Sequence, residues 1–325
     1  MESSTKKVRV ADVTTDLDPN GDMYIVLKNA DLPTLRYKVS SQILTFASPV
    51  FKVMLGPRFR EGTALRTQSH PDISLEEKNQ DAMDAMDTIL RYLHFRGHEV
   101  PIEKEPSEIA ALVVQCDKYD LTNAMSPVVQ LWSSVWCTEQ NLCNEEAIGL
   151  MVLATWTTKS KLLPKVLVIA VRNLEPGFED MWAEHDILKN MDPSASAFLL
   201  EEIWKAKETI ANTIEQKPVA LANEEEDRYC LSSELSPQPR PLLASLLITE
   251  MRQCGLWPVE QLHERHSITT LLSTMPRKPA DHTCTTGDSC SLRKQLNSAK
   301  DKAARLINSS LREQALQARQ VEFKF

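Results

Sequence analysis

Two short β-type segments followed by a long series of helical patterns constrain the fold of this sequence most strongly. Residues 22–27 form an apolar run rich in β-branched and aromatic side chains, and in residues 35–39 apolar side chains alternate with Arg36 and Lys38. Such alternation is typical of a half-buried strand, and the turn residues between the segments predict a hairpin. Because strands come first and helices follow, the pattern favours an α+β domain over a parallel α/β fold.

Helix-start signals follow the hairpin. Ser40 is expected to cap a brief helix, and Ser48-Pro49 combines a hydroxyl N-cap with proline at the first helical position. A polar loop then leads to a third strand within residues 70–75. Further helices are expected to start at Asp81, Ser107, Ser126-Pro127, Asn144, Pro164 and Asp192-Pro193.

The β patterns end near Cys137, so the rest of the chain is expected to be all-α. Residues 224–227 are a run of acidic side chains, and prolines repeat in residues 237–241, which is typical of a linker. We therefore expect a flexible tail (1–19), an α+β domain (20–136), a helical domain (137–216), an acidic and proline-rich linker (217–241) and a C-terminal helical region (242–325).

The N-terminal tail has one alternative interpretation. Val8, Val10 and Val13 alternate with polar neighbours, as in an added strand, but Ser, Thr, Lys and Asp dominate the first eighteen residues. The composition favours a flexible tail over a strand.

Charge and hydropathy exclude several classes of function. The chain has 37 Lys and Arg against 45 Asp and Glu, a net charge of −8, which argues against sequence-independent DNA binding. No apolar stretch is long enough to suggest a membrane span or a signal peptide. Seven scattered cysteines fit a reducing compartment, so we expect an intracellular protein in the cytoplasm or nucleus.

The last segment, residues 291–325, is basic and carries a stripe of Leu and Ala at helical spacing. We expect one long helix that packs onto the helical part of the chain. A nuclear regulator that binds nucleic acid through this helix is the less favoured alternative.

One group of residues has spacing that suggests a metal site. His282, Cys284 and Cys290 lie close in sequence, and Cys230, or alternatively Cys254, would complete a four-ligand set for structural zinc. The group lacks a tight Cys-x2-Cys pair, and the alternative interpretation is a polar loop with unpaired side chains. No other cofactor is expected, and without a catalytic motif we expect a protein that is not an enzyme.

Residues 22–136, roughly a third of the chain, resemble the BTB/POZ family, and in style its fungal members. The resemblance lies in the order and spacing of short motifs: Asp22-x-x-Ile-Val-Leu, Leu35-Arg-Tyr-Lys-Val39, Leu44-x-x-x-Ser48-x-Val-Phe51, Met54-Leu55, Phe59-x-Glu61, Ile89-Leu-x-Tyr-Leu93 and Asp117-Lys-Tyr119. Gly255-Leu-Trp-Pro258 adds a softer likeness to the fungal group.

The resemblance implies a protein-interaction module: a scaffold, or a substrate adaptor for a cullin-based ubiquitin ligase with a client protein. Phe59-Arg60-Glu61 matches the hydrophobic-x-acidic motif by which BTB adaptors contact cullins, and Phe51 and Met54 are further candidate partner-binding residues. The following helices would then correspond to a BACK-like domain. The alternative for Phe59 is packing within its own domain, with Glu61 solvated.

A self-assembling structural BTB protein, a homodimer without a ligase link, is the second implied function. Ser40 and Ser41 replace the His-Lys or His-Arg pair that many BTB proteins carry after the second strand. No C2H2 zinc-finger array follows the domain. A DNA-reading repressor is therefore not expected.

Overall fold

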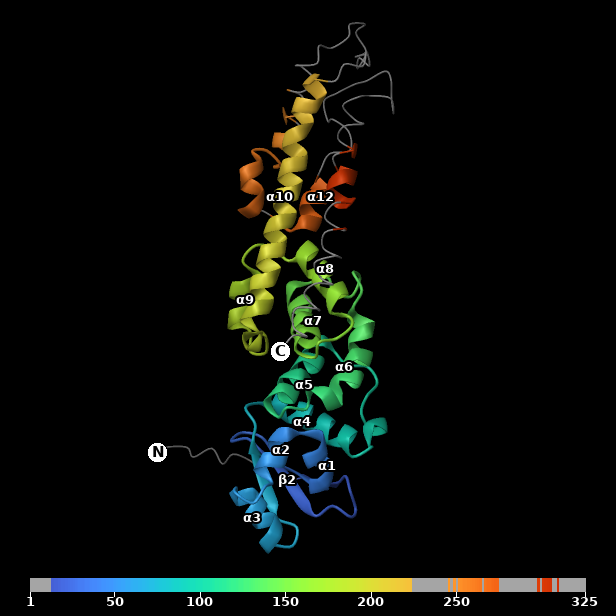
Figure 1. Cartoon of the computed structure of the whole chain (residues 1–325), viewed down its shortest axis with the longest axis vertical. Coiled ribbons are helices and arrows are strands. Elements are labelled where there is room, and N and C mark those ends of the chain that lie inside the picture. The colour runs from blue at the N-terminus through green and yellow to red at the C-terminus, as the bar shows by residue number, and fades with distance from the viewer. Residues whose placement is uncertain are drawn as a thin grey trace, which may run out of the picture. The chain divides into compact units, whose positions relative to one another are not determined.

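The computed structural model describes residues 13–223, 245, 248–249, 251–264, 266–274, 297–298, 300–305 and 309. Figure 1 shows the helices and strands of the described residues, and the chain divides into two compact units. Unit 1 comprises Met1–Cys137 and Leu153–Leu162, and unit 2 comprises Thr138–Val152 and Leu163–Phe325.

In the described residues, unit 1 has a four-stranded mixed sheet in the order β1-β3-β2-β4. Strands β2 and β3 form the antiparallel hairpin that the sequence predicts, with Met23 opposite Val39. Strands β1 and β4 pair in parallel with β3 and β2, respectively. The strand bounds are β1 Val13–Asp16, β2 Met23–Lys28, β3 Leu35–Val39 and β4 Asp72–Glu76.

Strand β1 corrects the expectation of a flexible tail through residue 19. The Val13 N–H donates to Thr34 O at 3.1 Å, and the Leu17 N–H donates to Lys38 O at 3.1 Å. These bonds pair backbone groups along the open edge of β3, an interaction that composition alone does not reveal. Val8 and Val10 lie outside the described residues.

The helices of unit 1 largely follow the predicted caps. Ser40, Ser48 and Asn79 accept bonds from first-turn N–H groups of α1, α2 and α4, respectively. Helix α3 replaces the predicted polar loop after α2. The bounds are α1 Ser41–Ala47, α2 Pro49–Met54, α3 Arg60–Thr67, α4 Gln80–Leu93, η1 Gly97–Glu99, α5 Pro106–Lys118 and α6 Thr122–Trp136.

The starts of α5 and α6 differ from the predicted ones. Helix α5 begins at Pro106 rather than Ser107, with Glu105 and Glu108 forming a capping box. Helix α6 begins at Thr122, so Pro127 lies inside the helix instead of at its start. Burial of Met125 and Trp132 on the same helix offsets the missing backbone hydrogen bond.

The core of unit 1 lies between the sheet and the helices. The following side chains from both are fully buried: Ile25, Leu27, Val39, Leu44, Phe51, Met86, Ile89, Leu90, Ile109 and Val113.

Unit 2 is helical in its described residues, as the sequence predicts beyond Cys137. Helix α10 packs against α8, η3 and α12. The bounds are α7 Glu145–Thr157, whose last residues belong to unit 1, α8 Leu163–Asn173, α9 Phe178–Glu184, η2 Leu188–Asn190, α10 Pro193–Asn223, η3 Val259–Glu264 and α12 Ile268–Thr274.

Helix α10 continues through Asn223, so residues 217–223 are helical and not part of the predicted linker. Val219-Ala-Leu-Ala222 includes good helix formers, which explains the difference. Residues 224–241 lie outside the described part. Of the predicted terminal helix, residues 297–298 and 300–305 are described and helical.

The predicted helical domain and C-terminal region meet in unit 2. The Ser267 N–H donates to the Glu175 carboxylate at 2.6 Å, and the Thr269 hydroxyl donates to Asn173 at 2.7 Å. The loop after α8 therefore holds the N-terminus of α12.

Candidate protein-interaction surface

Helix α2 has a buried face and an exposed face. Phe51 is fully buried, whereas Val53 is 58% exposed and Val50 is exposed beside it. The prediction that Phe51 contacts a partner is wrong, because its ring stacks on Tyr119 inside unit 1 with the ring centroids 5.3 Å apart.

Ser48 and Tyr119 attach the buried face of α2 to the end of α5. The Ser48 hydroxyl donates to the Tyr119 carbonyl and accepts the Phe51 N–H at 2.9 Å. The Tyr119 hydroxyl donates to the buried Glu77 carboxylate at 2.8 Å, and Lys118 pairs with the second Glu77 oxygen at 2.8 Å. Burial, together with the Glu77 charge, raises the pKa of Tyr119 and keeps its hydroxyl a donor.

Gly62 sets how closely α3 approaches the end of α2. A Cβ atom at this position would lie 1.9 Å from Gly56 O and 2.5 Å from Leu55 O, well inside van der Waals contact. Only glycine therefore permits this backbone approach. The contact places Phe59, the residue before α3, beside the exposed face of α2.

A shallow apolar groove results, here called the α2–α3 groove. It is lined by Pro49, Val50, Val53, Met54 and Phe59. Phe59 is 45% exposed. These side chains offer apolar surface that the described part of unit 1 leaves in contact with water.

Two of the predicted partner-binding residues, Met54 and Phe59, therefore line one groove. Glu61 lies two residues beyond Phe59 in the first turn of α3, where its half-buried carboxylate is favourably placed for the helix dipole. Its carboxylate is 3.7 Å from the Arg60 guanidinium, so a nearby cation already belongs to the chain itself.

Pro49, Val50, Val53 and Gly62 are the groove-forming residues that the sequence prediction missed as site residues. The i, i+3, i+4 spacing of Val50, Val53 and Met54 marks one helical face. Phe51 and Leu55 are also apolar, however, so the pattern alone does not identify which face is buried.

The predicted zinc ligands Cys230, His282, Cys284 and Cys290 all lie outside the described residues. Among the residues that are described, no group of three or more His, Cys, Asp or Glu side chains could hold a metal ion.

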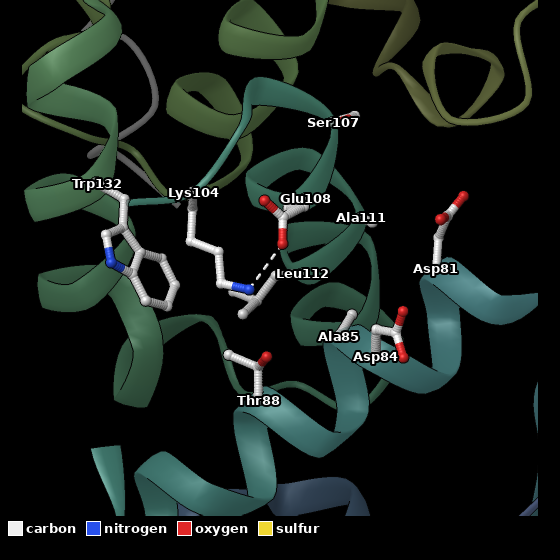
Figure 2. Close-up of a pocket in the computed structure, with 10 residues that line it drawn as sticks. All are labelled: Asp81, Asp84, Ala85, Thr88, Lys104, Ser107, Glu108, Ala111, Leu112 and Trp132. Atoms are coloured by element: carbon white, nitrogen blue, oxygen red, sulfur yellow. Dashed lines mark hydrogen bonds and ion pairs between the residues drawn. The ribbon is translucent and has the colours of Figure 1, made fainter. Parts of the chain in front are cut away.

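A second hollow lies between α4, α5 and α6, and Figure 2 shows its lining. Lys104 extends between Trp132 and Glu108, and its ammonium is 2.7 Å from the Glu108 carboxylate. Asp81 and Asp84 project from α4 on the opposite side (Figure 2). With a volume of about 60 Å³, the hollow has room for a few water molecules but not for a large cofactor.

Glu108 and Lys104 balance their charges within this hollow. Burial opposes ionisation of Glu108, but the Lys104 ammonium and the Glu105 N–H outweigh it and hold the pKa of Glu108 below its ordinary value. The Lys104 carbonyl also accepts the Trp136 indole N–H at 2.7 Å. This hollow is therefore built from internal contacts.

Comparison with known proteins finds no matching family model and no matching curated protein. Within the described residues, no helix has the length and apolar character needed to cross a membrane. The α2–α3 groove is therefore the candidate functional site, on the basis of its exposed apolar lining.

Proposed function

We propose that this chain is a protein-interaction module of the BTB/POZ type, with the α2–α3 groove receiving apolar side chains of a partner protein. One observation carries the proposal. Exposed apolar side chains gather on the outer face of α2, while the inner face of the same short helix is fixed by Ser48 and Phe51 to Tyr119. Such preorganised apolar surface binds with little loss of conformational entropy.

Contacts between the motif residues support the BTB/POZ part of the proposal. Ser48 and Phe51 come from one motif of the resemblance and Tyr119 comes from another, and the three side chains or backbone groups meet. The hairpin of β2 and β3 contains two further motifs. A scaffold or substrate adaptor, with a cullin as partner and a client bound elsewhere, is the proposed role.

Co-purification of the full chain with a cullin N-terminal domain tests the adaptor role. We expect wild type to bind and Val53→Asp, which places a carboxylate in the groove, to lose binding. Ile102→Asp is the matched control, because Ile102 is also an exposed aliphatic residue of unit 1 but does not line the groove. Absence of binding by wild type would remove the adaptor role.

Self-association is the second candidate function, favoured by Phe46 on α1. This side chain is 83% exposed, and α1 packs against α2. Light scattering of the full chain and of Phe46→Ser distinguishes the candidates. We expect a dimer that dissociates in the variant, and a wild-type monomer would count against this function.

A further inference from the structure

The α2–α3 groove lies in a locally basic part of an acidic protein. The whole chain has a net charge of −8. Residues 40–70, however, contain four cationic side chains and one carboxylate, Glu61, so this segment has a formal charge of +3. The cations are Lys52, Arg58, Arg60 and Arg66.

Three of these cations are next to groove-lining residues in the sequence. Lys52 is exposed and precedes Val53 on α2, while Arg58 and Arg60 stand on either side of Phe59 in the chain. Arg60 has a side chain that is 91% exposed, and its contact with Glu61 at 3.7 Å is too solvated to neutralise it strongly. In the described part of the chain, no carboxylate pairs with Lys52 or Arg58.

Cations beside an apolar surface impose a charge preference on whatever binds there. An apolar lining excludes water from the contact, and low dielectric strengthens the interaction with charges at its rim. Complementary charge speeds association, and like charge across an interface costs affinity. Glu61 alone, already near Arg60, does not reverse this preference.

We propose that the α2–α3 groove selects a partner segment that combines apolar side chains with carboxylates, an acidic amphipathic peptide segment. The inference rests on the docking function proposed above and specifies the partner's chemistry. Apolar side chains occupy the groove between Val53 and Phe59, and carboxylates of the same segment face Lys52, Arg58 and Arg60. A basic segment is rejected by the same three cations.

Peptide selection on the full chain tests the inference even while the natural partner is unidentified. A random displayed peptide library is selected on wild type and depleted on Val53→Asp, which places a carboxylate in the groove. We expect the remaining peptides to be enriched in both apolar and acidic residues. Enrichment of basic peptides, or of apolar peptides without acidic residues, would overturn the charge preference and leave the docking function standing.

Binding of the most enriched synthetic peptide is then measured by fluorescence anisotropy. We expect affinity to fall roughly tenfold or more in Lys52→Gln/Arg58→Gln/Arg60→Gln, and wild-type affinity to fall with added salt. Lys78→Gln, which removes another exposed cation of unit 1, is the matched control and should bind as wild type does. Equal affinity for wild type and the triple variant would contradict the inference.

Two further outcomes separate this inference from the docking function itself. If selection yields no peptide that depends on Val53, both the inference and the docking function fail. If phosphatidylserine vesicles bind wild type, Val53→Asp abolishes that binding and no peptide is selected, the groove is a membrane contact and both fail. Thermal melting of each variant checks the fold, which exposed substitutions should preserve.

Discussion

The two hollows of unit 1 differ in whether their lining side chains are exposed to water or paired within the chain. The α2–α3 groove presents Val53 and Phe59 to water. In the hollow between α4, α5 and α6, Lys104 instead pairs with Glu108 and Trp132 is buried. The comparison teaches that the Lys104–Glu108 pair is satisfied within the chain, whereas the exposed apolar side chains of α2 remain accessible to another molecule.

The largest expected effect separates the two faces of α2. Phe51→Ala removes a fully buried ring stacked on Tyr119 and should lower the free energy of unfolding by about 3–5 kcal/mol. Val53→Ala changes an exposed side chain and should alter it by about 0.5 kcal/mol or less. Urea unfolding followed by circular dichroism, with hydrogen exchange in α2, measures both. Similar losses in the two variants would mean that the faces are not distinct.

The next effect tests the packing that forms the groove. Helix propensity alone predicts that Gly62→Ala stabilises α3 by about 1 kcal/mol. The added Cβ would instead collide with Gly56 O, so we expect destabilisation of about 1–3 kcal/mol and weaker binding at the groove. Thermal unfolding and peptide binding are the measurements, and Thr63→Ala on the same helix is the control. A more stable Gly62→Ala protein would refute the close approach.

The second hollow should show a smaller effect that stays local. Lys104→Met removes the partner of Glu108 and should cost about 0.2–1 kcal/mol. The pKa of Glu108 should rise, because burial then acts without the compensating ammonium. Carboxyl chemical shifts followed by NMR titration measure this change. Peptide binding at the α2–α3 groove should be unchanged. A loss of binding would show that the two hollows are energetically coupled.

The smallest effect is confined to a pH window and concerns the anchor of α1. The buried His94 ring donates from Nδ1 to Leu90 O at 2.9 Å and accepts the Ser40 N–H on Nε2 at 3.1 Å. Burial lowers the pKa of His94, although Leu90 O and the Asp18 charge act in the opposite direction. The folded state therefore favours the neutral form of the His94 ring.

Because the folded pKa lies below the unfolded one, stability from His94 is present above the unfolded value of about 6.5 and is lost as pH falls below it. Urea unfolding between pH 7.5 and 5 should show this decline in wild type. His94→Gln, which cannot titrate, should be less stable at neutral pH but should show a flatter decline. An equally steep decline in the variant would assign the pH dependence to other groups.

Sequence reasoning succeeds where the determinants are local. Ser40 and Ser48 cap the helices that follow them, and the alternation of β3 predicts the hairpin with β2. These features depend on a few neighbouring residues. The starts of α5 and α6 differ from the prediction because a capping box and a tolerated internal proline compete with the more obvious serine signals.

The candidate site was less accessible to prediction, because its geometry depends on distant contacts. Phe51 and Val53 are both apolar and two residues apart, and it is Phe51 that is buried, against Tyr119 from a distant part of the chain. The need for glycine at position 62 arises from the backbone of α2, which no local pattern reveals. Met54 and Phe59 could be identified, since they belong to the motifs of the resemblance.

The hydrogen bond between the Ser267 N–H and the Glu175 carboxylate joins parts of unit 2 that are 92 residues apart along the chain. Buried apolar residues of α12, Ile268 and Leu271, reinforce this attachment. Peptide-bond cleavage in the intervening sequence would therefore leave the second fragment seated on α8 by non-covalent forces. We expect two separately produced halves of this unit to recombine from solution through the contacts between α12 and α8.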